Sequence, residues 1–555
     1  MTRKARGADI LAQALVRAGT RYLFSLSGNQ IMPVYDAAID AKLEIVHTRH
    51  EGAAVHMADA WGRLTGEPGV AIVTGGPGHA NAVSALYTAL ASDSPMVLLS
   101  GHAPLGQLGK GAFQEMRQAD MAAPVAKASW TAQSAAGLGH DMARAFAIAR
   151  SGRPGPVHVS LPFDVLEAAA GDAATLPEAA AFAGRATPLG EVVAATVIAQ
   201  IARAKRPLVI GGPQLGTDRG RAAAARLRAA TGVPVVCMES PRGIADPALG
   251  AFADVLGEAD LVVLLGKPLD FTLRFGQTGA FAADCRFIAI DSDVDVIARD
   301  LANLGDPARM VLTAVADTLA AADALTAAAG QGGAHRAWSD EVAAAIAHRP
   351  AGWESLKPRA DGPVHPVEVG RAVQSVIDAA PAAVLVADGG EFGQWAQACV
   401  SAPTRILNGP AGSIGSALPF ALAARLARPQ ATVVALLGDG TFGFHAAEFD
   451  TAVRAQLAFV AVVGNDACWN AEHQIQLRTY GPQRTVGCEL LPTRYDQVVA
   501  AFGGHGEHVV RAADLPAALG RAVASQRPAC VNVALESLPA PTVSRRAAPA
   551  GGGAH

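Results

Sequence analysis

The sequence predicts an α/β protein made of three doubly wound parallel-sheet domains. Short apolar runs alternate with stretches of helical spacing along the chain, and many of these runs end at glycine. The 555 residues exceed what one core supports, because a domain usually holds roughly 100–200 residues. We expect the domains to cover residues 1–168, 188–328 and 364–534, and the Pro-, Ala- and Gly-rich residues 535–555 to form a flexible tail.

The composition is that of a globular protein with large buried cores. Hydrophobic residues make up 51% of the chain, charged residues make up 17%, and the formal net charge is −4. This charge gives no electrostatic basis for binding nucleic acid, and no apolar run approaches the ~20 residues needed to cross a bilayer. The six cysteines include no Cys-x-x-Cys pair, and the first residues do not form a secretory leader. We therefore expect a soluble, cytoplasmic protein with reduced thiols.

The first domain shows the alternation of helices and strands clearly. Apolar residues in the segment 10–18 recur at helical spacing and stop at Gly19. Predicted strands cover residues 43–46, 70–73, 96–99 and 157–162. The Ala- and Gly-rich segment 168–187 then predicts a linker to the second domain.

The second domain has the pattern of a Rossmann-like unit. Its predicted strands cover residues 207–212, 261–266 and 287–291, and the first two end at glycine. Glycine-ended strands suit a nucleotide-type site, although a domain with a purely structural role has the same pattern. The next boundary lies in the segment 328–363.

Two acidic residues at strand ends give the third domain its chemical signal. The strand predicted at 433–437 ends at Gly438-Asp439-Gly440. After a helix predicted at 448–456, the strand at 459–463 ends at Gly464-Asn465-Asp466. Parallel strands place their carboxyl ends at one edge of the sheet, and Mg²⁺ takes oxygen ligands that it shares with phosphates. Since glycine also admits an anion closely, we predict a magnesium–diphosphate anchor. A strand end with a helix-capping aspartate is the alternative.

These segments resemble the thiamin diphosphate (ThDP) motif of the acetolactate synthase-like superfamily. The resemblance rests on Gly438-Asp439-Gly440, Glu448-Phe449-Asp450-Thr451 and Gly464-Asn465-Asp466. It implies ThDP and Mg²⁺ as cofactors, with Asp439, Asp466 and the main chain of Cys468 as metal ligands. The family usually carries a second Asn where this chain has Asp466. The three domains would then be a pyrimidine-binding, a central Rossmann-like and a diphosphate-binding domain.

The resemblance extends to catalytic candidates in the first domain. Arg49-His50-Glu51 resembles the segment of the activating glutamate of ThDP enzymes, whose carboxyl group hydrogen-bonds the aminopyrimidine ring and promotes deprotonation of the thiazolium. A simple helix-dipole partner is the alternative for Glu51. Gln114 would contact the substrate carbonyl or hydroxyl group. His79 and Asn29 are further catalytic candidates, although a structural histidine and a plain turn residue are the alternatives.

Other loops that match the family would contact the cofactor. Ile414 stands where the family has a bulky apolar residue that supports the bent cofactor, a role compatible with ordinary core packing. The cofactor-binding candidates are Gly28, Glu51, Gly78, Asn81, Gly389, Gly390, Glu391, Gly412, Ile414, Gly438, Asp439, Gly440, Thr441, Asp466, Cys468 and Trp469.

Within the superfamily, the motifs are most similar to those of 2-hydroxyacyl-CoA lyases. The similar segments are 269–276, 388–392, 448–451 and 464–469. Such an enzyme cleaves a 2-hydroxyacyl-CoA into an aldehyde or ketone and formyl-CoA, and can run in reverse as a carboligase. A benzaldehyde lyase-like or acetolactate synthase-like carboligase without CoA is the first alternative. A catalytically silent regulatory protein that binds ThDP is the second.

The resemblance also implies partners. The substrate would be a small molecule, and the chain would form a homodimer or homotetramer, because in this superfamily the cofactor lies between domains of two subunits. The central domain would be the place for CoA or ADP. Its candidate phosphate partners are Lys267, Arg274, Arg545 and Arg546, although such cations are most often solvated surface groups.

Overall fold

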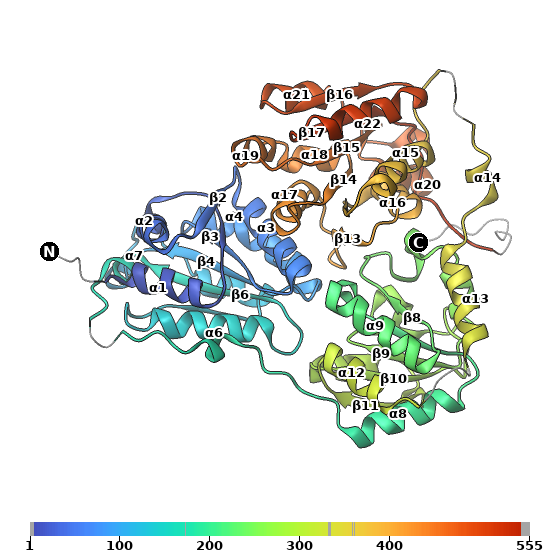
Figure 1. The fold of residues 1–555 in the computed structure, drawn as a ribbon, viewed down its shortest axis with the longest axis horizontal. Coiled ribbons are helices and arrows are strands. Elements are labelled where there is room, and N and C mark those ends of the chain that lie inside the picture. The colour runs from blue at the N-terminus through green and yellow to red at the C-terminus, as the bar shows by residue number, and fades with distance from the viewer. Residues whose placement is uncertain (1–4, 172–173, 331–334, 358, 360, 546–555) are drawn as a thin grey trace.

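The computed structural model describes residues 5–171, 174–330, 335–357, 359 and 361–545. Figure 1 shows three α/β units, with the N-terminal unit at one end of the molecule and the central and C-terminal units side by side at the other. Each unit contains one sheet, and every strand pair in the three sheets is parallel. The predicted fold class is therefore confirmed.

The N-terminal sheet has six strands in the order β2-β1-β3-β4-β6-β5. Its central strands β3, β4 and β6 are buried along their whole length, as expected when helices cover both faces of a parallel sheet. The strands are β1 Tyr22–Ser25, β2 Glu44–His47, β3 Gly69–Val73, β4 Met96–His102, β5 Ala128–Thr131 and β6 Pro156–Pro162. The helices are α1 Gly7–Arg17, α2 Met32–Ala41, α3 Glu51–Thr65, α4 Pro77–Ala91, α5 Gln118–Ala122, α6 Leu138–Arg150 and α7 Phe163–Glu167.

The central sheet has five strands in the order β11-β10-β9-β7-β8. The strands are β7 Pro207–Gly211, β8 Val235–Cys237, β9 Leu261–Leu265, β10 Arg286–Asp291 and β11 Met310–Val315. The helices are α8 Glu191–Arg203, α9 Asp218–Thr231, α10 Phe252–Leu256, α11 Val294–Asn303, α12 Thr318–Ala328, α13 Arg336–Ala347 and α14 Ala351–Glu354.

The C-terminal sheet has six strands in the order β13-β12-β14-β15-β17-β16. Counted from the first strand of its own domain, this order equals that of the N-terminal sheet. The strands are β12 Ala383–Ala387, β13 Thr404–Leu407, β14 Thr432–Gly438, β15 Val460–Asn465, β16 His505–Val509 and β17 Ala529–Ala534. The helices are α15 Pro366–Ala379, α16 Gly390–Cys399, α17 Ala417–Ala427, α18 Asp439–His445, α19 Glu448–Arg454, α20 Asn470–Tyr480, α21 Tyr495–Ala501 and α22 Leu515–Ala524.

The N-terminal and C-terminal domains share one hydrophobic core. Helix α3 packs against α17, and small residues such as Ala54, Ala58, Ala421 and Ala424 lie in the same buried cluster. Alanine lets the two helices approach closely, and close packing maximises dispersion contacts. The two domains of one chain therefore hold each other in a fixed orientation.

Three segments differ from their predicted form. The helix predicted at 448–456 ends at Arg454, the strand predicted at 459–463 is shifted to Val460–Asn465, and the segment 168–187 is anchored by Phe182, which is 2% exposed and packs edge-on against Phe146. An aromatic side chain buries a large apolar area. Part of the predicted linker, including Phe182, therefore belongs to the core of the first domain.

The prediction of a flexible tail is wrong for residues 535–545. Leu535 is 6% exposed and pairs with Val364 in a parallel bridge. The Trp395 Nε1–H donates to the carbonyl oxygen of Pro539 at 2.9 Å. The proline-rich composition hid these apolar and backbone contacts. The remaining part, 546–555, lies outside the described residues.

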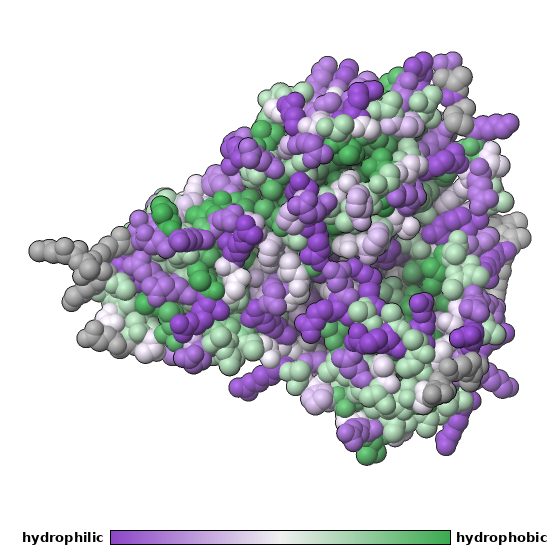
Figure 2. Space-filling model, viewed as in Figure 1, coloured by the Kyte–Doolittle hydropathy of each residue, from purple (hydrophilic) through white to green (hydrophobic). Residues whose placement is uncertain are grey.

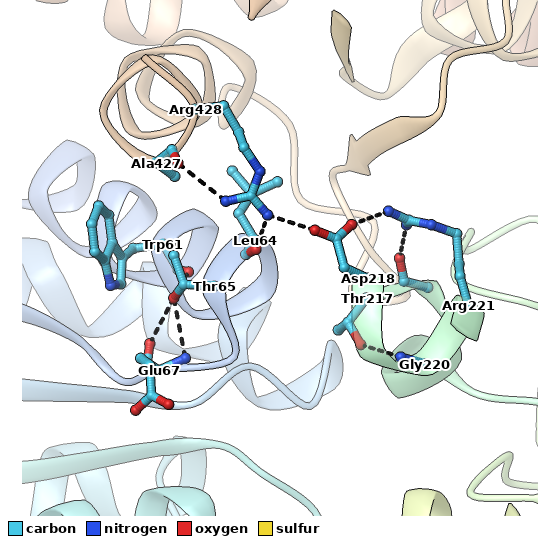
Figure 3. Close-up of polar contacts among 11 residues, drawn as sticks. Trp61, Leu64, Thr65, Glu67, Thr217, Asp218, Gly220, Arg221, Ala427 and Arg428 are labelled. Atoms are coloured by element: carbon cyan, nitrogen blue, oxygen red, sulfur yellow. Dashed lines mark hydrogen bonds and ion pairs between the residues drawn. The ribbon is translucent and has the colours of Figure 1, made fainter. Parts of the chain in front are cut away.

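One arginine joins all three domains. Arg428, directly after α17, donates from Nη2 to the Leu64 carbonyl oxygen in α3 and to the Asp218 carboxylate at the start of α9, both at 2.6 Å. Figure 3 shows its guanidinium between these two partners. Such charge-assisted contacts tie the domains together at a point where the main chain does not.

Arg428→Ala should lower the midpoint of the first thermal unfolding transition by about 2–4 °C per kcal/mol lost. The reason is that two contacts between domains disappear while the Asp218 carboxylate keeps its neighbour Arg221. Differential scanning calorimetry measures the shift. Arg425→Ala is the control, because Arg425 bonds only the Ala431 carbonyl of its own domain. Equal losses in both variants would contradict a bridging role for Arg428.

Candidate active site

The predicted cofactor residues lie at equivalent edges of the two six-stranded sheets. In each sheet the strand order reverses between the first and third strands, and open α/β sheets bind ligands outside the carboxyl ends of strands at such a point. In the N-terminal domain Gly28 lies in the loop after β1, and Gly78 lies in the first turn of α4 after β3. In the C-terminal domain Gly389 follows β12, and Asp439 opens α18 directly after β14. The topology therefore explains why these distant residues form two groups.

Glu51 is the first residue of α3 and is 8% exposed. Its Oε2 accepts a hydrogen bond from Asn81 Nδ2 at 3.0 Å. Its Oε1 faces Gly78 in the first turn of α4, because a Cβ added at Gly78 would lie 3.3 Å from it. One oxygen of the carboxyl group is thus held by Asn81, and the other oxygen lies beside a glycine.

Thr74 organises the glycine loops around Glu51, a role that the sequence did not reveal. Its Oγ1 donates to Gln30 Oε1 at 2.6 Å, and the same oxygen accepts from the Gly75 amide at 2.9 Å. A Cβ at Gly28 would lie 2.3 Å from Thr74 Cβ, and one at Gly78 would lie 2.8 Å from Thr74 Cγ2. Both glycines are therefore required by close packing.

Asp439 and Asp466 follow the adjacent strands β14 and β15, which pair Gly438 with Gly464. The two strand ends therefore meet as predicted. Asp439 is 2% exposed, and its Oδ2 has no hydrogen-bond partner among the described residues. Burial raises the pKa of Asp439 to about 7, helped by the nearby negative charge of Asp466, and burial raises the pKa of Asp466 to about 6.

This acidic pair fits a divalent cation. The Gly440 amide donates to Asp439 Oδ1 at 2.9 Å, while Asp439 Oδ2 has no partner among the described residues. Within the described ranges, no group of three or more His, Cys, Asp or Glu side chains is arranged to hold a metal ion. Mg²⁺ normally needs only one or two carboxylates, because water and phosphate oxygens complete its shell.

Of three predicted neighbours of the pair, Gly440 and Thr441 have a structural role and Gly438 has none in this conformation. A Cβ at Gly440 would lie 2.6 Å from the Trp469 ring, so this glycine is needed for packing against Trp469. Thr441 Oγ1 donates to the Gly438 carbonyl oxygen at 2.9 Å. Gly438 has open space where a Cβ would stand, so it is the glycine that can admit an anion.

Asp388 links the other two predicted cofactor loops. Its fully buried carboxylate accepts hydrogen bonds from the amides of Gly389, Gly415 and Ala417 at 2.7–3.2 Å. Ile414 lies against the first of these loops, since a Cβ at Gly389 would be 2.8 Å from Ile414 Cγ2. Asp388 was not selected from the sequence, although an aspartate directly after a strand and before two glycines was the signal.

The other catalytic candidates differ in accessibility. The His79 ring is fully buried, its Nδ1 bonds Ser100 Oγ at 2.8 Å, and burial lowers its pKa to about 4, so substrate does not reach it in this conformation. Gln114 has φ 57°, packs on Gly76, and its buried Oε1 has no partner among the residues described. Asn29 is exposed. Of these residues, Gln114 best suits a substrate contact.

Glu448 connects the C-terminal domain, which carries the acidic pair, to the N-terminal domain, which carries Glu51. Its buried Oε1 accepts from the Arg49 amide at 2.9 Å, and its Oε2 accepts from Thr451 Oγ1 at 2.7 Å. The loop that precedes Glu51 is therefore held by a residue 399 positions away. No hydrogen bond or ion pair between described residues joins Glu51 itself to Asp439 or Asp466.

Two buried histidines at this domain junction predict acid sensitivity. The rings of His56 and His445 lie 5.8 Å apart, and burial lowers the pKa of each to about 3. Below pH 6.5 the unfolded chain binds protons that the folded chain excludes. Stability should therefore fall by up to about 1.4 kcal/mol per pH unit for each ring, with no effect from these rings above pH 6.5.

Urea unfolding of His445→Leu between pH 7.5 and 5.0 tests this expectation. The variant should lose part of the pH slope of the wild type. A variant of the exposed His140 to Leu serves as the control and should keep the full slope. Identical slopes in His445→Leu and wild type would show that the ring titrates normally in the folded chain.

The central domain does not fit the predicted CoA or ADP phosphates. Its strand order reverses between β7 and β9, but there the backbones touch, because a Cβ at Gly212 would lie 2.2 Å from the Gly266 carbonyl oxygen. Lys267 is 4% exposed and donates to Thr272 Oγ1 at 2.5 Å beside Asp270. Buried ion pairs leave Lys267 no free charge for a ligand.

The other candidate phosphate partners give no nucleotide site either. Arg274 is exposed on the surface, and the amide of Arg545 donates to Asp254 Oδ2 at 2.6 Å. Arg546 lies outside the described residues. A cavity of about 440 Å³ lies between the three domains near Arg428, but none of the predicted site residues line it.

The fold and the two residue groups define an enzyme class. Two domains of equal topology carry, at equivalent edges, a buried glutamate facing a glycine loop and an acidic pair with a free oxygen. This is the arrangement of a ThDP-dependent enzyme, in which one domain receives the pyrimidine ring and the other the diphosphate.

Comparisons with known proteins agree with this class. The N-terminal TPP binding domain of thiamine pyrophosphate (ThDP) enzymes matches residues 5–121, their central domain matches residues 194–321, and their C-terminal TPP binding domain matches residues 388–533. A probable acetolactate synthase of Mycobacterium bovis is 36% identical over 536 residues, which is 94% of each chain.

Two lyases are also similar along most of the chain. The 2-hydroxyacyl-CoA lyase 2 of Homo sapiens is 31% identical over 559 residues, covering 90% of this chain and 84% of its own length. The 2-hydroxyacyl-CoA lyase of Oryza sativa is 27% identical over 562 residues, which is 96% of each chain. The chain belongs to the thiamine pyrophosphate enzyme family, and its relatives include acetolactate synthases and 2-hydroxyacyl-CoA lyases. It is a ThDP-dependent carbon–carbon lyase or carboligase.

Over the part of the chain that the structure covers, no helix combines the length and apolar character needed to span a membrane.

Proposed function

We propose that this enzyme uses ThDP and Mg²⁺ as a 2-hydroxyacyl-CoA lyase, cleaving its substrate reversibly to an aldehyde or ketone and formyl-CoA. The observation that carries this choice is an open cavity of about 660 Å³ beside the Gln114 loop, lined by residues such as His102, Gly111 and Glu115. This space is larger than a three-carbon 2-oxo acid needs, and it suits an extended thioester. The similarity to lyases of several organisms supports the same choice.

The residues divide the work as follows. Bound ThDP supplies the reactive carbon and the electron sink of this chemistry. Asp439 would hold Mg²⁺ through its free Oδ2, with Asp466 beside it. Glu51 would hold or release a proton at Oε1, because Oε2 already accepts from Asn81. Gln114 would orient the substrate through its side-chain amide. The nitrogen would donate to a carbonyl group, and the unpartnered oxygen would accept from a hydroxyl group.

The CoA part of the substrate would lie outside the central crevice, which Lys267 and the Gly212–Gly266 contact close. The nucleotide would then extend over the surface of the site. The central domain would serve mainly to place its loops against the C-terminal domain. An ADP or CoA molecule resident in that crevice is therefore not part of the proposal.

A second candidate is an acetolactate synthase-like carboligase. The acetolactate synthase similarity of 36% over 94% of the chain favours it. This enzyme would act on 2-oxo acids without CoA, using the same Glu51 and Asp439.

The active unit would be a homodimer or homotetramer. Large hydrophobic side chains are exposed on both cofactor domains, among them Tyr87 at 50%, Phe113 at 70% and Phe444 at 53%. Figure 2 shows hydrophobic patches among hydrophilic residues over these two domains, and further ones over the central domain. Exposed apolar patches support a protein interface, and a second subunit would bring its own Glu51 to the Asp439 group.

Product analysis tests the proposal. The purified enzyme is incubated with ThDP and Mg²⁺ and with 2-hydroxyacyl-CoA esters, 2-hydroxyketones or pyruvate, and products are identified by mass spectrometry. Formyl-CoA with a matching aldehyde or ketone is the expected result. Acetolactate from pyruvate, without cleavage of any CoA ester, would favour the second candidate and refute the first.

A further inference from the structure

A turn of the central domain reaches the predicted cofactor loop of the C-terminal domain. The turn covers residues 240–243, and Ser240 Oγ accepts from the Arg242 amide at 3.2 Å. At its end, Gly243 has φ 55°, and a Cβ there would lie 2.0 Å from the Thr272 carbonyl oxygen. Only glycine fits this position. The turn is therefore fixed in one conformation against its own domain.

The other side of this turn faces the C-terminal domain. Pro241 Cβ lies 3.6 Å from the position of a Cβ at Gly412, two residues before Ile414. Next to it, Arg242 Nη2 lies 4.0 Å from Glu391 Oε2. Glu391 is the second residue of α16 and follows the loop of Gly389. The central domain thus places a guanidinium beside the loops that would hold the cofactor.

The Arg242–Glu391 pair is incomplete on both sides. Glu391 is 7% exposed, and its Oε2 has no hydrogen-bond partner among the described residues. The distance of 4.0 Å exceeds a charge-assisted hydrogen bond, which is about 2.7–2.9 Å. The Arg242 side chain is 47% exposed and donates no hydrogen bond to a described residue. A guanidinium has five N–H donors in a planar fork, so all of them remain available.

The surroundings keep this guanidinium available. Arg242 lies near enough to Glu391 to lower its pKa, and Arg478 acts in the same direction, against the rise that burial causes. Glu391 therefore attracts Arg242 towards the site without saturating its donors. A planar fork of this kind matches carboxylate and phosphate oxygens.

Resting on the proposed function, we propose that Arg242 is a specificity-determining residue that binds an oxyanion of the substrate at the mouth of the site. In a 2-hydroxyacyl-CoA this group is a phosphate of the CoA part, and in a 2-oxo acid it is the carboxylate. A neutral 2-hydroxyketone has no such group. Arg242 thus favours anionic substrates, and Glu391 positions its guanidinium.

Steady-state kinetics of the holoenzyme test this assignment with three substrates: a 2-hydroxyacyl-CoA, pyruvate and benzoin. Arg242→Gln should raise KM for the anionic substrate that the wild type uses by about 10- to 100-fold, with little change in kcat. Kinetics with benzoin should not change. Arg242→Lys should restore part of the affinity, because lysine keeps the charge without the fork. Arg206→Gln is the control, since Arg206 is a similarly exposed arginine of the central domain that pairs with Glu258.

Calorimetric titration of the holoenzyme with free coenzyme A and with pyruvate gives a readout without turnover. Weaker binding of both anions, or of the one that the wild type binds, is expected in Arg242→Gln. Unchanged KM and unchanged anion binding would overturn the assignment, and so would an equal loss with benzoin. If the wild type cleaves no CoA ester but converts pyruvate, the proposed lyase function fails while the pyruvate KM still tests Arg242.

Discussion

Asp439→Asn should abolish the stabilisation by ThDP plus Mg²⁺ and yet leave the ligand-free protein more stable than wild type. In the wild type, ligands at 100 times their Kd add about 2.7 kcal/mol, which the variant should lose with its free Oδ2. Activity should fall more than ~100-fold, since loss of groups that merely support a metal site costs 10- to 100-fold. The ligand-free variant is more stable than the wild type because the wild-type site buries two carboxylates close together, away from water.

The pKa of Asp439 determines at which pH the ligand-free Asp439→Asn variant is more stable than the wild type. Burial raises the pKa of Asp439 to about 7, far above that of a carboxyl group in an unfolded chain. Protonated Asp439 therefore contributes to the free energy of unfolding. This contribution is fully present below pH 4 and is lost as the pH rises through 7. At pH 8 the Asn variant should be more stable by about 1–3 kcal/mol, while near pH 4 the difference should vanish.

Thermal unfolding with and without ThDP, Mg²⁺ and EDTA measures both effects. Asp450→Asn is the control, because Asp450 lies on the neighbouring helix and pairs with Arg454. It should keep the ligand-induced gain. An Asp439→Asn protein that still gains stability from ThDP plus Mg²⁺ would remove this residue from the metal site.

The strand ends that carry the site were predictable because buried parallel strands leave a direct mark. β14 and β15 are continuous apolar runs that stop at Gly-Asp-Gly and Gly-Asn-Asp, so the position of both aspartates followed from the sheet edge. Glu51 had no such local mark, since an acidic residue opens many helices. Its prediction depended on family resemblance.

Contacts between distant segments could not be predicted from local pattern. α18 begins at Asp439 in the glycine-rich segment Asp439–His445, which has low intrinsic helix propensity. It forms because Phe442 is fully buried against Phe449 and Tyr495. The hydrogen bond from the Arg49 amide to Glu448 likewise joins two domains. Neither sequence segment has a hydrophobic periodicity that would indicate this contact. Tertiary packing decides both features.

The same packing keeps the two predicted cofactor sites, the acidic pair and Glu51, on separate domains. The acidic pair lies on one domain and the glutamate on another, and within the chain Glu448 and the α3–α17 core hold the two domains rigidly. A variant at Glu51 can therefore change proton transfer without moving the metal site. This separation makes the second large effect testable.

Glu51→Gln should lower kcat by about 10²- to 10⁴-fold while leaving the fold and ThDP binding intact. Gln keeps an oxygen that can accept from Asn81, but it removes the group that holds or releases a proton. Hydrogen–deuterium exchange at the thiazolium carbon of bound ThDP, followed by NMR, should become slow. Glu44→Gln, at an exposed position of β2, should exchange like wild type. Unchanged exchange in Glu51→Gln, with ThDP bound, would mean that this carboxyl group does not activate the cofactor.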